Sequence, residues 1–84
     1  MRNPETMATS LIGTWMKDSF GDLYLIKTKP QLNPSGYYTC DVVVYNTYNF
    51  TFRGYFGNTI LSALDNITSR EDMIAVMFCE CLNS

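Results

Sequence analysis

The chain has 84 residues, 46% of them hydrophobic and 17% charged, with a formal net charge of −2. This length gives one domain with a small core, and the composition is that of an ordered globular chain rather than a disordered one. Its six basic residues are scattered singly, which argues against nucleic acid as the main partner, because duplex-binding domains have a clustered positive surplus.

The first residues show no periodic pattern. Residues 1–9 include a proline and no apolar run, so we expect a flexible N-terminal arm followed by a single compact domain over residues 10–84. The arm lacks the apolar segment of a secretory signal, and no stretch approaches the ~20 apolar residues that span a bilayer. The sequence therefore predicts a cytoplasmic protein, not bound to a membrane, with reduced cysteines.

Two short strands are predicted next. Residues 10–17 form the first, and residues 18–22 form a turn in which Asp favours the first position and Gly21 accepts a positive φ. Residues 23–29 form the second strand. Residues 30–36 contain two prolines and a glycine, which predict an irregular break.

The strongest β signal lies in residues 37–56, where aromatic and β-branched residues are dense. It predicts a hairpin of two strands, residues 37–45 and 48–56, joined at Asn46-Thr47. One side of each strand is apolar and is expected to face the core. The inward set is expected to be Tyr38, Cys40, Val42, Val44, Tyr48, Phe50, Phe52, Gly54 and Phe56.

The C-terminal residues 58–84 are expected to cover this sheet. A helix is predicted to begin at Asn58 or Thr59, and a second one after Ser69, where a capping serine precedes acidic residues. Residues 73–82 fit a helix or a strand equally by periodicity, and the acidic cap favours a helix. In that helix Ile74, Met77, Phe78 and Cys81 form an apolar stripe.

The predicted fold class is therefore α+β: a four-stranded antiparallel β-meander covered by one or two C-terminal helices. The alternative is an all-β, small barrel-like meander that residues 73–82 close as a strand.

The residue types argue against catalysis. The chain has no histidine, which excludes Ser-His-Asp and Cys-His arrangements. A zinc site would need Cys40, Cys79 and Cys81 with a carboxylate such as Glu80, but the C-x-C spacing is shorter than that of structural zinc sites. We therefore expect no enzyme activity, catalytic residue, cofactor or metal.

A surplus of aromatic surface is the remaining feature. A helical layer covers one face of a sheet, and Tyr and Trp on the other face are typical of a protein interface. The candidate partner-binding residues are Trp15, Tyr37, Tyr45, Arg53 and Tyr55. The expected partner is another protein, a second copy of the chain in a homodimer, or both.

These features predict a non-catalytic protein-binding module that acts as a small inhibitor or accessory subunit by occupying a partner's surface. Small phage proteins directed against host machinery fall in this size class. An alternative follows from Gly13-Thr14-Trp15, which is similar to the opening of avidin- and lipocalin-type barrels. That resemblance implies a small apolar-ligand carrier with a shallow β-cup, and its cavity is expected to be lined by Trp15, Phe50 and Phe52.

Overall fold

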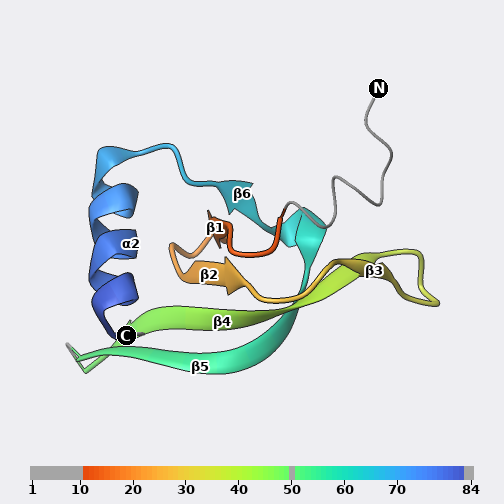
Figure 1. Cartoon of the computed structure of the whole chain (residues 1–84), viewed down its shortest axis with the longest axis horizontal. Helices are drawn as coiled ribbons and strands as arrows, with labels where there is room; N and C mark the ends of the chain where they lie inside the picture. Colours follow the sequence, from red (N-terminus) through yellow and green to blue (C-terminus); the bar gives the residue numbers. More distant parts are fainter. Residues whose placement is uncertain (1–10, 50, 83–84) are drawn as a thin grey trace.

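A computed structural model describes residues 11–49 and 51–82 of the chain (Figure 1). Its elements are β1 (Trp15–Lys17), β2 (Leu23–Ile26), β3 (Gln31–Leu32), β4 (Tyr38–Tyr48), β5 (Thr51–Ile60), the 3-10 helix η1 (Leu61–Ala63), β6 (Asp65–Asn66) and helix α2 (Arg70–Leu82). The chain is thus a small α+β protein, as predicted, with a curled antiparallel sheet and a C-terminal helix. The expected arm, residues 1–9, lies outside the described residues.

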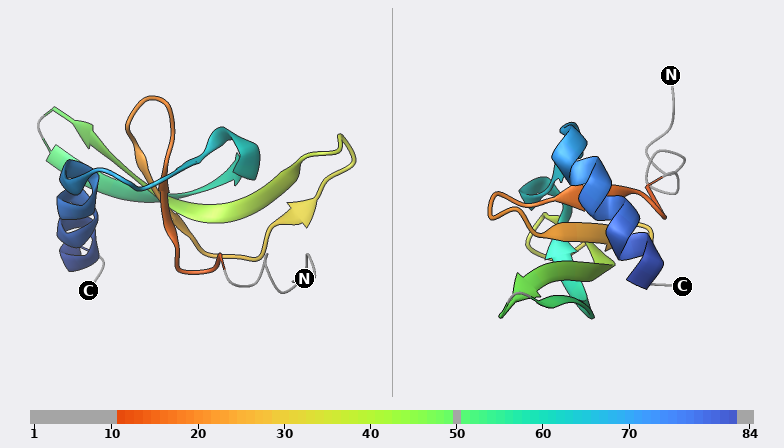
Figure 2. Two further views of the ribbon diagram at one scale, coloured as in Figure 1. Left: turned by 90° about the horizontal axis from the view of Figure 1, so that it is seen from above. Right: turned by 90° about the vertical axis from the view of Figure 1, so that its left-hand side faces the viewer.

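The long strand β4 organises the sheet. β5 pairs with it along one edge, and β2 and β3 follow one another along the other edge. β1 then pairs with β2, and β6 with β1, all antiparallel. Only η1 and Leu64 separate β5 from β6 in the sequence, although these strands lie at opposite ends of the strand order. The sheet is therefore strongly curled (Figures 1 and 2).

The hairpin turn lies three residues later than predicted. β4 continues through Asn46 and Thr47, and its last pair joins Tyr48 to Thr51. Asn49 follows with a φ of 51°, a left-handed conformation that asparagine tolerates better than most residues with a side chain. The predicted join at Asn46-Thr47 is therefore wrong, because a residue suited to the turn also stands at position 49.

The register places the two predicted inward sets on opposite faces of the sheet. Gly54 pairs with Tyr45, and Phe56 with Val43. Directly paired residues share a face, so Phe56 lies on the side of Val43, away from the side of Val44. The prediction that both sets face one core is wrong, and each face of β4 has an apolar set of its own.

Two small cores result, one on each face of the sheet. The first lies inside the curl and consists of Met16, Ile26, Cys40, Val42, Val44 and Leu64. The second lies under α2 and consists of Leu23, Leu25, Val43, Tyr45 and Cys79. β4 contributes to both cores, and its four residues from Val42 to Tyr45 are all buried.

Two further predictions are corrected. β5 continues to Ile60 where a helix was predicted to begin at Asn58 or Thr59, because β4 is 11 residues long and offers pairing partners along this whole stretch. The Asn58 side chain also donates a hydrogen bond to Asp41 Oδ1 at 3.0 Å. Within the predicted break at residues 30–36, Gln31 and Leu32 form β3.

The predicted helix after Ser69 is confirmed. The Ser69 hydroxyl oxygen accepts a hydrogen bond from the backbone N–H of Asp72 at 3.1 Å, which caps α2. The Asp72 carboxylate also accepts a hydrogen bond from Lys17 Nζ of β1 at 2.7 Å. This ion pair ties the first turn of the helix to the sheet.

Gly54 provides a test of the packing at β5. A Cβ atom at this position would lie 2.7 Å from Cε1 of the Tyr45 ring, which is buried in the second core. We expect Gly54→Ala to destabilise the protein by about 1–3 kcal/mol in denaturant unfolding, the range for overpacking. Gly57→Ala is the matched control, because its Cβ would meet Val44 at an ordinary 3.5 Å. Equal losses in the two variants would contradict this packing.

The Lys17–Asp72 pair predicts how stability changes with pH. The hydrogen bond from Lys17 lowers the pKa of Asp72, and the same bond raises the pKa of Lys17. A carboxyl whose pKa is lower in the folded state stabilises the folded protein at any pH above its pKa in the unfolded state, which is about 3.9. This stabilisation is lost as the pH falls through the pKa of the folded state. We expect stability to decrease below about pH 4, and Asp72→Asn to flatten this dependence in thermal unfolding. Glu71→Gln, in the same helical turn, should leave the slope in place.

Candidate functional site

The five predicted partner-binding residues do not lie on one face. Trp15 and Tyr45 pack together under α2, with ring centroids 5.3 Å apart. Tyr37 is exposed in the loop before β4, and Arg53 and Tyr55 are exposed on β5.

Tyr45 is only 3% exposed, so its expected place on an open face is wrong. Burial raises the pKa of its hydroxyl, and the neighbouring Cys79 adds to this effect. Trp15 beside it is half-buried. The reason for the correction is that α2 covers the very face that was expected to stay bare, so both rings form part of the second core.

β5 lies at an edge of the sheet. It is ten residues long, and among the described residues it pairs with β4 alone. Its other edge therefore offers backbone N–H and C=O groups along the lower side of the molecule in Figure 1. Phe56 is 85% exposed on the α2 side of this strand, and Tyr55 is exposed on the opposite side. We call Arg53, Tyr55 and Phe56, with the backbone between them, the β5 edge surface.

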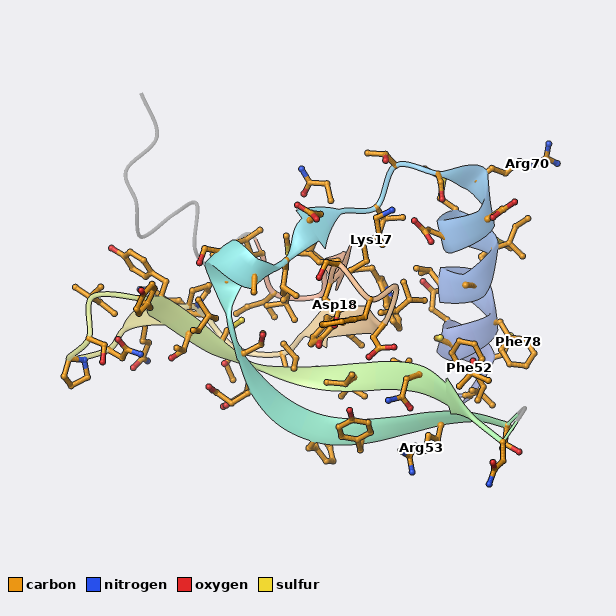
Figure 3. All side chains as sticks on the ribbon, turned by 180° about the vertical axis from the view of Figure 1, so that it is seen from behind. Lys17, Asp18, Phe52, Arg53, Arg70 and Phe78 are labelled. Atoms are coloured by element: carbon orange, nitrogen blue, oxygen red, sulfur yellow. The ribbon has the colours of Figure 1, made fainter. Side chains whose placement is uncertain are left out.

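A polar group on this surface is held in a fixed arrangement. Arg53 Nε donates a hydrogen bond to Asn46 Oδ1 at 3.1 Å, and its guanidinium lies 5.9 Å from the centre of the Tyr55 ring. The Asn46 amide in turn donates to the Tyr55 hydroxyl at 3.5 Å. A cation over an aromatic face is attracted to it, so Arg53 and Tyr55 orient one another. Figure 3 shows Arg53 directed away from the body of the protein.

Phe56 stands between two open hollows. One, of about 210 Å³, is lined by Val43, Tyr45, Gly54, Tyr55, Phe56 and Leu82. The other, of about 500 Å³, is lined by Lys27, Thr28, Asp41, Phe56, Gly57 and Asn58. Side chains of a chain lying next to β5 would find room on both sides of this ring.

The cavity expected for a ligand carrier can be compared with three hollows. A third hollow, of about 370 Å³, lies by the β1–β2 turn and includes Phe52 in its lining, but Trp15 lines none of the three. Phe50, the third expected lining residue, lies outside the described residues.

Helix α2 has a second apolar side that sequence reasoning placed wrongly. Its packed side consists of the small residues Ala75, Val76 and Cys79. Of the predicted stripe, Ile74, Met77 and Cys81 are exposed, and Phe78 is half-exposed at the side of the helix, where its ring meets Phe52 of β5. We call the exposed set the α2 outer face; it consists of Met73, Ile74, Met77 and Phe78. The signal for it was the absence of any polar side in residues 73–79, which is typical of a helix buried all round.

Asp18, outside these surfaces, has a structural role. The Asp18 carboxylate accepts hydrogen bonds from the backbone N–H groups of Phe20 and Asp22 and from the Tyr24 hydroxyl at 2.8 Å, which closes the β1–β2 turn. Burial raises the pKa of the Asp22 carboxyl, with a further contribution from Asp18. Within residues 11–49 and 51–82, no group of three or more Cys, Asp or Glu side chains is placed to hold a metal ion.

Comparison of the chain with protein-family models, with curated proteins and with solved structures gives no match. In the part of the chain that the structure describes, no helix is long and apolar enough to cross a membrane.

The thiols give a test of these burial assignments. Burial raises the pKa of the Cys79 thiol to about 11 and that of Cys40 above its ordinary value, whereas Cys81 is exposed. Because the thiolate is the nucleophile, a pKa two units above normal lowers the reactive fraction roughly 100-fold. We expect a small aromatic disulfide reagent, applied to dilute native protein, to modify one thiol rapidly and two slowly. Cys81→Ser is expected to abolish the rapid phase, and a rapid phase that survives this change would contradict the assignment.

Proposed function

We propose that this protein is a non-catalytic protein-binding module, a small inhibitor or accessory subunit, which docks through the β5 edge surface. The proposed occupant is an extended segment of another protein that adds as a strand alongside β5. The observation that supports this is the ten-residue edge itself, which no described strand covers.

Edges of this kind are usually protected. Natural sheets blunt them with lysines, prolines, inward charges or very short strands. β5 contains no proline, lysine or carboxylate, and Arg53 is its one charged residue. The lack of protection is consistent with an edge that is covered when the protein performs its function.

The chemistry of the surface indicates what the added strand is like. Its backbone would supply hydrogen bonds to the outer edge of β5, and its alternate side chains would fall on the two faces of the sheet. On the α2 side they would meet Phe56 and the hollows beside it. On the other side they would meet Tyr55. The expected segment is therefore low in charge, with apolar side chains at alternate positions.

The residue chemistry supports binding rather than catalysis. The chain has no histidine to act as a general base near neutral pH. Burial raises the pKa of the Cys40 and Cys79 thiols, which makes both poor nucleophiles. An effect on a partner would then come from occupying its surface.

The test is Phe56→Lys. The ring is almost fully exposed, so we expect stability to change by less than about 0.5 kcal/mol. The tagged wild type is used to capture proteins from a lysate of its native cells, and the captured proteins are quantified by mass spectrometry. Because a charge at this edge disfavours an added apolar strand, the Phe56→Lys variant is expected not to capture them. The matched control is Phe20→Lys, which changes a ring that is 90% exposed in the β1–β2 turn.

Two results would contradict the proposal. One is a Phe56→Lys variant that retains the same proteins as the wild type. The other is a Phe20→Lys variant that loses the same proteins to the same extent, since the loss of binding would then not be specific to the β5 edge surface.

A further inference from the structure

The α2 outer face has no cover in the part of the chain that the structure describes. Figure 1 shows α2 at one end of the molecule, and Figure 2 shows that its far side is open in two other directions. Met77, near its centre, is 65% exposed. The helix packs its small residues against the sheet and turns Ile74 and Met77 outward, the reverse of an ordinary surface helix.

Two charges of α2 are unfavourably placed for a helix that stands alone, although Glu71 and Asp72 in the first turn suit the dipole. Arg70 begins the helix, where the dipole disfavours a cation, and Glu80 lies in its last turn, where the dipole disfavours an anion. The last turn has no basic residue. Both charges would be well placed next to the opposite end of another α2.

We propose that the α2 outer face binds a second copy of this chain, with the two α2 helices antiparallel across a two-fold axis. Such an axis makes one patch complementary to itself. Arg70 of each copy then lies beside the last turn of the other copy's helix, close to its Glu80. Figure 3 shows Arg70 at the start of α2, directed away from the sheet and available for this contact.

The helix length agrees with this pairing. The midpoint of α2 is residue 76, so at 1.5 Å per residue Arg70 lies about 9 Å from the axis and Glu80 about 6 Å on the other side. In an antiparallel pair these two levels coincide to within about 3 Å, well within reach of an arginine side chain. A parallel pair would instead place Arg70 beside Arg70 and Glu80 beside Glu80, which is repulsive. These two charges therefore favour the antiparallel arrangement; Glu71 reaches the same level but lies about 120° around the helix from Met77.

The apolar residues agree with it as well. Ile74 and Met77 lie on either side of the helix midpoint. Across the two-fold axis they therefore meet Ile74 and Met77 of the second copy. Met73 and Phe78 flank them, and Phe78 is already held edge-on against Phe52 with ring centroids 5.6 Å apart. The 13-residue helix gives only about 20 Å of contact length, which is small for a protein interface. We expect a dimer that dissociates in the micromolar range.

The experiment is sedimentation equilibrium on the full chain from low micromolar to near-millimolar concentration. The wild type is expected to reach the dimer mass. Met77→Lys is expected to remain a monomer throughout, with unchanged far-ultraviolet circular dichroism. Phe20→Lys and Phe56→Lys are the controls and are expected to dimerise like the wild type, which separates this surface from the β5 edge surface.

The charge pair tests the orientation. Arg70→Glu and Glu80→Arg are each expected to weaken dimerisation at least fivefold, and the double variant is expected to restore it. In a parallel dimer each single change would replace one like-charged pair by another and leave the affinity unchanged.

Labelling of Cys81 gives a reading without any substitution. This exposed thiol follows the outer face in the last turn of α2, so its modification is expected to slow as the wild-type concentration rises. A wild type that stays monomeric at the highest concentration would overturn the proposal, even if it retained other proteins through α2. A Met77→Lys variant that still dimerises would overturn it too.

Discussion

The whole structure depends on burying both faces of β4. Its residues Val42 to Tyr45 are consecutive and all buried, so their side chains point alternately into two separate cores. A strand with two apolar faces needs a cover on each side. On one side the sheet supplies it by curling, which brings Leu61 of η1 and the adjacent Leu64 over the core of Val42 and Val44. On the other side α2 supplies it, held in place by the capped first turn and the contact with Lys17.

A chain of 84 residues meets this requirement with little to spare. Each cover is one layer thick, and each has an outer surface of its own. The small residues of α2 pack against the core of Tyr45 and Trp15, and the large apolar residues Ile74 and Met77 are left on the outside. The helix thus buries apolar surface of the sheet and exposes apolar surface of its own. For Trp15 and Tyr45 the expected apolar surface was therefore placed on the wrong element, because the sheet face under α2 was assumed to be bare.

The parts of the fold that sequence reasoning predicted were those encoded locally. Ser69 and the acids after it mark a helix start through their own side chains, and the structure confirms it. The face assignments failed because Val43 and Tyr45 are as apolar as Val42 and Val44, so alternation in β4 gave no direction. The turn was misplaced because Asn46 and Asn49 are both suited to one, and only the long-range pairing with β5 decides between them. Where α2 docks is likewise a tertiary choice, and it determined that Tyr45 is core and Ile74 is surface.

The two candidate surfaces lie on different elements, and this separation has a consequence for binding. A dimer through the α2 outer face leaves the edge of β5 uncovered, because that edge runs along the sheet while the helix closes one end of it (Figure 1). Such a dimer would present two β5 edges in a fixed relation set by the two-fold axis. A partner with two extended segments would then bind the second one as an intramolecular step, at an effective concentration far above that of the free protein. The overall affinity would then exceed that of a single edge-strand contact without any additional contact at either β5 edge. Such avidity would allow so small a protein to bind a larger assembly stably.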